Sequence, residues 1–177
     1  MKDSTNGEFR DFKKMKIWVK KNSGYKCMML YARSLAITWG GPPYWVWNCY
    51  KETGDDNIEV AKLTGVRDLD VQGRFKMSEL SPGVVYEIAY IVKLTNGASG
   101  WELPVTLKIT LPGQGGREKK RQYSLLEKPR GVWMELVGGS FQSMARETGE
   151  VIFDFYNHDT PSKSGLIIKG IIIRPKN

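Results

Sequence analysis

Apolar and polar residues alternate with a period of two through most of the chain after residue 30. In the segment 84–94 every even-numbered position is apolar, and Glu87 and Lys93 fall among the odd-numbered ones. The segment 101–111 alternates in the same way, with Pro104 on its outward face. A period of two is typical of a strand with one buried face. Both segments are therefore predicted strands, and Pro104 indicates an edge strand or a bulge, because proline cannot donate a ladder hydrogen bond.

Shorter segments of the same kind are separated by turn sequences rich in Gly, Pro, Asn and Asp. About ten short strands without a long amphipathic helix are typical of an all-β protein built as an antiparallel β-sandwich, and this is the predicted fold class. One helical turn is expected at 141–148. The remaining predicted strands lie at 34–39, 44–50, 58–63, 68–76, 121–126, 131–137, 150–157 and 166–174.

The net positive charge of the 177-residue chain, formally +8, comes from two segments. Residues 1–26 hold eight Lys and Arg against three Asp and Glu, and residues 117–130 hold six against two. The rest of the chain is close to neutral. Basic residues spread over one broad face would indicate a nucleic-acid groove, whereas a basic tail and one basic loop do not. Nucleic acid is therefore not the expected main partner.

The chain divides into a basic N-terminal extension at 1–26 and a single domain at 27–177. The extension has no apolar run of the kind that marks a secretory signal, and no segment of the chain is apolar enough to span a membrane. Apolar residues between 12 and 19, Trp18 among them, indicate that part of 13–26 adds a strand to the sandwich. Residues 1–12 are expected to be flexible.

Four aromatic residues within nine positions form the clearest candidate binding feature. Trp39, Tyr44, Trp45 and Trp47 flank a turn of two glycines and two prolines. Tryptophan offers a large apolar face and a polar N–H group, which suits stacking against the C–H face of a sugar. The alternative is that these rings fill the end of a β core, since tryptophan is highly buried on average.

Catalytic and metal-binding groups are scarce. The one histidine, His158, has no nucleophile or paired carboxylate at a telling spacing, so neither an enzyme nor a cofactor is expected. No cluster has the spacing of metal ligands. Cys27 and Cys49 are expected to be thiols, with a bridge between them left open. The segment 113–120 lacks the ending of a phosphate-binding loop and is predicted to be a hairpin loop, in which Arg117–Arg121 could also serve as a nuclear-import patch.

A polar loop follows the predicted strand 150–157. Asn157, His158, Asp159 and Lys163 supply donors and acceptors that suit sugar hydroxyls and an N-acetyl group. The alternative is an ordinary polar loop.

Blocks in a constant order resemble the plant lectin family typified by phloem protein 2 and the tobacco agglutinin. They extend from residue 30 to residue 176, which makes them more specific than any single motif. The resemblance implies a jelly roll, in agreement with the sandwich predicted from the alternation. The blocks are Ala32-Arg33-x-Leu35-x-Ile37-Thr38-Trp39, Tyr44-Trp45-x-Trp47, Ile58–Leu63, Leu80-Ser81-Pro82 with Tyr86, Trp133–Leu136, Gly149-Glu150-Val151, and Lys163–Ile168 through Arg174-Pro175-Lys176.

The same resemblance implies a function without enzymatic activity. The expected partner is a glycan containing N-acetylglucosamine (GlcNAc), either a chitooligosaccharide or the core of an N-glycan, bound without a metal. The resemblance implies ring surface from Trp39, Tyr44 and Trp45, polar contacts from Asn157, His158 and Lys163, and binding or its support from Glu150. For Glu150 a structural role on its strand is equally favoured.

Ser162 departs from the family pattern, in which an aromatic residue, typically Trp, precedes Lys-Ser-Gly. Without that aromatic ring, one stacking plane is missing. The alternative function is therefore a phloem protein-interaction or RNA-interaction module in which the sugar site has decayed. The expected location is the cytoplasm, including phloem sap, with the nucleus as a second compartment. A homodimer and binding to other phloem proteins are left open.

Overall fold

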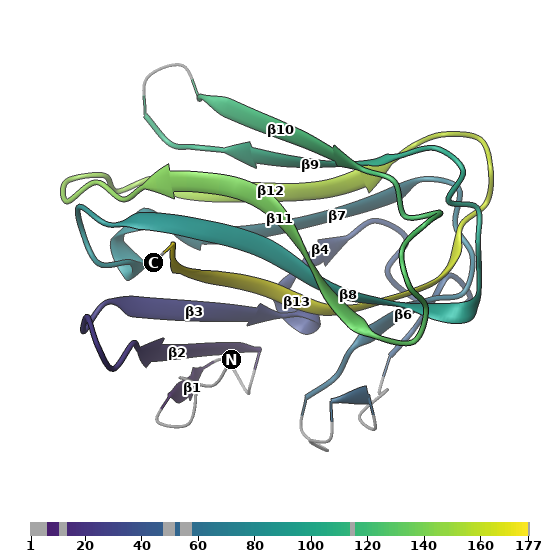
Figure 1. Ribbon diagram of the computed structural model, residues 1–177, viewed down its shortest axis with the longest axis horizontal. Coiled ribbons are helices and arrows are strands. Elements are labelled where there is room, and N and C mark those ends of the chain that lie inside the picture. The colour runs from purple at the N-terminus through teal and green to yellow at the C-terminus, as the bar shows by residue number, and fades with distance from the viewer. Residues whose placement is uncertain (1–6, 11–13, 48–51, 54–57, 114–115, 177) are drawn as a thin grey trace.

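The computed structural model describes residues 7–10, 14–47, 52–53, 58–113 and 116–176 (Figure 1). The described chain is an antiparallel β-sandwich of jelly-roll type, with two sheets packed face to face, which confirms the predicted fold class. Its described helices are 3-10 turns at Ala32–Ser34 and Met77–Glu79, and neither is long enough to cross a membrane.

The larger sheet is organised around its last strand. The central strand β13 pairs with β8 on one side, and with β3 and β6 on the other; β11 continues the sheet beyond β8. The sheet comprises β1 (Glu8–Arg10), β2 (Met15–Val19), β3 (Lys26–Tyr31), β5 (Trp45–Val46), β6 (Ala61–Leu63), β8 (Val85–Ser99), β11 (Trp133–Gln142) and β13 (Ser164–Pro175).

The smaller sheet holds five strands in the order β10-β9-β12-β7-β4. Its inner face alternates as the sequence predicts: in β9 the buried residues Val105, Leu107 and Ile109 alternate with half-buried polar ones. The strands are β4 (Ala36–Ile37), β7 (Leu69–Lys76), β9 (Val105–Thr110), β10 (Glu118–Tyr123) and β12 (Glu150–Asn157).

Apolar side chains cover both faces of the larger sheet near its centre. The main core lies between the sheets, and a second cluster on the outer face includes Trp18, Met29, Ile91 and Ile172. A strand buried on both faces has no need of polar positions, and it reads as a continuous apolar run. This explains why 166–173 is nearly unbroken in apolar residues while the strands of the smaller sheet alternate.

Tyr90 connects the two sheets through the middle of the core. Its side chain is fully buried on β8, and its hydroxyl donates to the Phe153 carbonyl of β12 at 2.7 Å. Its ring lies 4.5 Å from that of Phe153 and 5.1 Å from that of Phe155, centroid to centroid. Burial raises the pKa of the Tyr90 phenol well above its ordinary value.

The N-terminal segment is part of the sandwich. Glu8–Arg10, which were expected to be flexible, form β1 and pair with β2. The extra strand expected within 13–26 is β2, which pairs along its length with β3 and buries Trp18. Gly7 is also described, whereas residues 1–6 and 11–12 lie outside the described part of the chain. Cys27 is buried on β3, and the bridge to Cys49 that was left open falls outside the described residues, as Cys49 does.

Several boundaries differ from those predicted. The edge position inferred from Pro104 is wrong, because β9 begins at Val105 and lies between β10 and β12; the proline precedes the strand and needs no ladder partner. The helical turn expected at 141–148 is absent there: β11 runs through Gln142 and a non-helical loop follows. Strand β10 begins at Glu118, three residues earlier than predicted, so 118–120 is not loop.

Replacing Tyr90 by phenylalanine tests the connection between the sheets. Tyr90→Phe removes the hydrogen bond to Phe153, so we expect the free energy of unfolding at neutral pH to fall by about 1 kcal/mol. Above a pH of about 10 an unfolded tyrosine releases its proton while the buried one keeps it, so wild-type stability should fall by up to about 1.4 kcal/mol per pH unit from this group.

The phenylalanine variant lacks that contribution, so its free energy of unfolding should decline less steeply between pH 10 and 11.5. Urea denaturation of both proteins at stepped pH measures the difference. Parallel declines would show that Tyr90 ionises as freely in the folded state as in the unfolded one.

Candidate functional site

An open pocket lies at the end of the sandwich where β4 and β7 meet the loop that follows β12. Figure 1 shows the elements that meet at this end. The backbone N–H of Thr38, just past β4, donates to the Asp70 carbonyl of β7 at 3.0 Å, which sets Trp39 beside the start of β7. The pocket has a volume of about 260 Å³. It is lined by Trp39, Tyr44, Gly65, Val66, Arg67, Asp68 and Ser162.

Trp39 is the most unusual residue of this pocket. Its side chain is 58% exposed, and its backbone has a φ of +57°, a left-handed conformation that bulky residues seldom adopt. Its ring lies 5.5 Å from that of Tyr44, centroid to centroid, with the planes tilted by 58°. Such a conformation costs on the order of 1 kcal/mol or more and persists only when the surrounding structure enforces it.

Hydrogen bonds around the turn at residues 39–47 hold the backbone in this conformation. The Trp47 indole N–H donates to the Gly40 carbonyl at 2.7 Å, and the Thr64 backbone N–H donates to the Tyr44 carbonyl at 2.8 Å. A side chain at Gly40 would approach the Ile37 carbonyl to 2.8 Å, so this turn requires glycine there. The exposed rings of Trp39 and Tyr44 therefore stand on a fixed turn.

Trp45 does not take part in the pocket. It was expected to offer ring surface, but it lies in β5 opposite Leu63 and is only 1% exposed, within the main core. The neighbours Tyr44 and Val46 point outward. Trp45 therefore follows the alternative given for these aromatic residues, which is that they fill the core. Its ring has no exposed face for a ligand.

Lys163 and Asn157 support the backbone of the loop between β12 and β13. Lys163, expected to contact sugar, is 1% exposed, and its ammonium group donates to the carbonyls of Arg67 at 2.6 Å, Asp159 at 3.0 Å and Pro161 at 3.1 Å. Burial lowers the pKa of this ammonium. These contacts fix Ser162 beside the turn at Gly65–Asp68, with the Lys163 and Val66 backbones paired as a β-bridge.

Asn157 is also buried, at 4% exposure, and is fully engaged. Its side-chain amide donates to the Pro104 carbonyl at 2.8 Å, and its side-chain oxygen accepts the Asp159 backbone N–H at 2.9 Å. Asn157 and Lys163 thus affect the pocket through the shape of the loop.

His158 and Glu150 lie outside the pocket lining. The His158 imidazole is about half exposed and lies 3.2 Å from the Asp70 carboxylate, near the same rim. Glu150 begins β12 whereas Asn157 ends it, which separates them by about 23 Å at the rise of an extended strand. The Glu150 carboxylate lies 3.8 Å from Arg74 on the neighbouring strand, a position that suits the structural role left open for it.

Arg67 and Asp68 belong to the pocket although no sequence argument singled them out. Both side chains are about half exposed or more, with 4.0 Å between guanidinium and carboxylate. A guanidinium donates to hydroxyl and carbonyl oxygens, and a carboxylate accepts from hydroxyls. Their only signal in the sequence is that they form a polar pair where the predicted strand 68–76 begins.

The described residues contain no group of three or more His, Cys, Asp or Glu side chains placed to hold a metal ion. The pocket therefore presents two aromatic rings, one cation, one anion and a small hydroxyl. This set suits a neutral polar ligand with an apolar face.

Several known proteins resemble this chain over most of its length. Residues 25–175 match the sequence profile of the family described as phloem protein 2. A protein named lectin from Luffa acutangula is 42% identical over 174 residues, covering 97% of this chain and 81% of the relative. Protein PHLOEM PROTEIN 2-LIKE A1 from Arabidopsis thaliana is 39% identical, covering 93% and 67%. A solved xylan-binding domain from Paenibacillus barcinonensis superposes on 82% of this chain and 87% of its own, at 12% identity and a TM-score of 0.49.

The buried ammonium of Lys163 can be tested by substitution. In Lys163→Met three carbonyls lose their donor, so we expect the free energy of unfolding to fall by about 2–3 kcal/mol. The exposed Lys120→Met on β10 is the matched control and should change stability by less than about 0.5 kcal/mol. Urea denaturation compares the two. If both variants unfold like wild type, the loop does not depend on the ammonium.

Proposed function

The chain belongs to the phloem protein 2 family, and from this membership and the pocket at Trp39 we propose that it is a carbohydrate-binding lectin without enzymatic activity. The relatives from Luffa acutangula and Coccinia grandis are both named lectins, and the second is 32% identical to this chain. We extend the name lectin to this chain, with the sugar lying against Trp39.

The exposed, left-handed Trp39 is the observation that carries the proposal. Nothing in the fold requires a tryptophan there: its ring lies largely in solvent, and glycine would fit the backbone without strain. Strained backbone that persists despite its cost tends to occur where a side chain must be presented to a ligand. A sugar ring lying on the indole face would bury the surface that the turn leaves open.

We propose GlcNAc oligomers or the N-glycan core as the ligand, bound without a metal. The N-acetyl group has a methyl that suits the angle between Trp39 and Tyr44, and a carbonyl and an N–H that suit Arg67 and Asp68. Phloem sap and cytoplasm are the proposed locations, with glycoproteins there as partners.

Ser162 supports a second candidate function. It lines the pocket as a small, exposed side chain where the family pattern has an aromatic ring. A site with one stacking plane fewer binds sugar more weakly. If no glycan binds, the second candidate is an interaction module for other phloem macromolecules, in which the sugar site has decayed.

Two substitutions of Trp39 should affect sugar binding alike and stability differently. With chitotriose in the presence of EDTA, Trp39→Ala should weaken binding by about tenfold or more, equivalent to about 1.4 kcal/mol, because the stacking face is lost. Trp39→Gly should bind equally poorly, yet be more stable than the alanine variant by about 1 kcal/mol, because glycine adopts the left-handed conformation freely. Calorimetric titration and thermal unfolding measure the two quantities.

Tyr25→Ala is the control for Trp39, because Tyr25 is a similarly exposed aromatic in the turn between β2 and β3. It should leave chitotriose affinity unchanged. Wild-type protein that binds no GlcNAc-containing glycan at millimolar concentration would remove the lectin proposal and favour the interaction module.

Restoring a ring opposite Trp39 should strengthen binding. A ring laid on a sugar face removes about 60 Å² of apolar surface from water, which at about 25 cal/mol per Å² is about 1.5 kcal/mol, or roughly tenfold in affinity. Ser162→Trp should approach this gain, less the entropy of ordering the new side chain. Ser162→Ala is the control and should bind like wild type. Weaker binding by the Trp variant, with the fold intact, would place the sugar away from this loop.

A further inference from the structure

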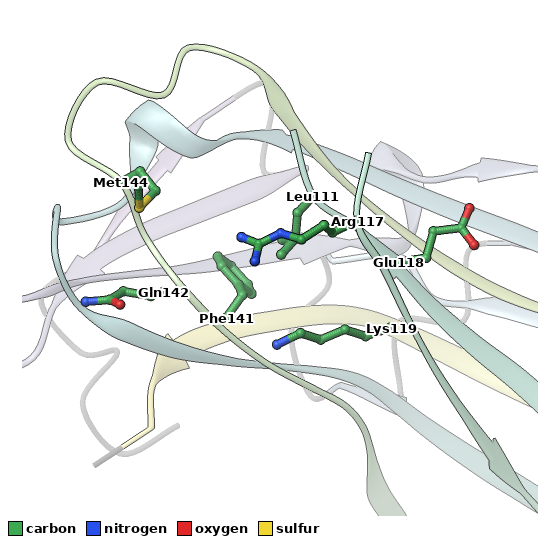
Figure 2. A pocket seen from close by; sticks show the side chains of 7 residues that line it. All are labelled: Leu111, Arg117, Glu118, Lys119, Phe141, Gln142 and Met144. Carbon is green, nitrogen blue, oxygen red and sulfur yellow. The ribbon is translucent and has the colours of Figure 1, made fainter. Parts of the chain in front are cut away.

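A second cavity lies at the opposite end of the sandwich, where β9 turns into β10 and β11 ends (Figure 2). Its volume is about 440 Å³, within the range of about 300–1,000 Å³ that is usual for small-molecule sites. An adjoining recess shares Arg117 and Met144 with it. The cavity is lined by Leu111, Arg117, Glu118, Lys119, Phe141, Gln142 and Met144.

The cavity exists because the edges of the two sheets separate there. Strand β10 is the edge of the smaller sheet and β11 lies at the edge of the larger one. The Tyr123 hydroxyl donates to the Val137 carbonyl at 2.8 Å, and the Lys119 ammonium donates to the Ser140 carbonyl. The two strands belong to different sheets and have no backbone pairing. Beyond Lys119 no further side-chain hydrogen bond joins β10 to β11 among the described residues, and the core is accessible between them.

The floor of the cavity is apolar. Leu111 and Phe141 are almost fully buried members of the main core, at 7% and 3% exposure, and they present an edge to the opening. Met144 is 60% exposed and lies at the rim, where Figure 2 shows it beside the opening. Methionine is flexible and polarizable, so it can close over an apolar ligand of varied shape.

The rim is positively charged. Arg117 forms no ion pair with any described residue, and Figure 2 shows its side chain extending across the cavity in the direction of Phe141. The nearby acids are otherwise occupied: the Glu118 carboxylate lies 4.0 Å from Lys108 and points away from Arg117, and the Glu147 carboxylate accepts the Gly149 backbone N–H at 3.1 Å. A cation without an ion-pair partner, beside an apolar floor, is complementary to an anion that has an apolar body.

We propose that this cavity is a second ligand site, for a small organic carboxylate with an apolar chain. The planar guanidinium of Arg117 would receive the carboxylate through two parallel hydrogen bonds, with Lys119 adding charge. The chain of the ligand would lie on Leu111, Phe141 and Met144. The site lies at the far end of β12 from Trp39, so it does not rest on the proposed sugar binding.

Octanoate is a suitable probe. Acetate, which has the carboxylate without the long chain, and octanol, which has the chain without the charge, are its controls. Calorimetric titration of the whole chain should show octanoate binding, and both acetate and octanol should bind about tenfold more weakly or worse, because each lacks one part of the complementarity. Trp39→Ala should leave octanoate affinity unchanged. Loss of octanoate binding in that variant would place the acid at the aromatic pocket and overturn the proposal.

Variants at the rim test the assignment to Arg117. Arg117→Gln should weaken octanoate binding by about fivefold or more, and Met144→Ser by about threefold, whereas the matched control Lys120→Gln, on the strand that follows Arg117, should stay within about twofold of wild type. Glu147→Gln should strengthen binding modestly. All four side chains are at the surface or rim, so thermal unfolding should show intact folds.

Three outcomes would overturn the second site. Equal losses in Arg117→Gln and Lys120→Gln would indicate general attraction to a basic strand, screened by salt. Acetate or inorganic phosphate competing as well as octanoate would indicate an anion patch without an apolar site. Absence of any octanoate binding up to millimolar concentration would show that the cavity is not a site for this class of ligand.

Discussion

Packing of the two sheets against Tyr90 is the constraint on which both ends of the molecule depend. The Tyr90 hydroxyl reaches across the core to Phe153, and its ring meets two phenylalanines of β12. A buried, fully satisfied tyrosine allows little sliding of one sheet over the other. Strand β12 is thereby fixed in place, and its two ends define the positions of the two cavities: the Trp39 pocket near Asn157 and the Arg117 cavity near Glu150.

Polar residues of the Trp39 pocket divide into those that build it and those that can touch a ligand. Lys163 and Asn157 are buried and hold carbonyl groups of the loop, while Arg67, Asp68 and Ser162 are accessible. Buried polar groups must be satisfied by hydrogen bonds, so a lysine in the interior is committed to its carbonyl partners. The pocket thus combines a rigid support with a short, exposed set of contact groups, as binding loops on rigid scaffolds commonly do.

The two cavities differ in the origin of their apolar surface. At Trp39 the surface belongs to side chains that a strained turn holds outside the core, so it is flat and open. At Arg117 the surface belongs to the core itself, which is reached where β10 and β11 separate. A flat ring suits the face of a sugar, whereas a gap between sheet edges suits a narrow chain. The two proposed sites therefore suit different kinds of ligand.

Alternation along the sequence was sufficient to predict an antiparallel sandwich and most of its strands, because a period of two depends only on the pleat of each strand and on which face meets the core. It could not tell Trp39 from Trp45. Both are tryptophans beside the same turn, and only the pairing of β5 with β6 turns Trp45 into the core, while the left-handed backbone at residue 39 holds the other ring outside. Lys163 likewise appears as a polar loop residue until the carbonyl of Arg67, distant in sequence, approaches its ammonium. The sequence determined which side chains were available; burial, and with it their roles, was decided by contacts between strands far apart along the chain.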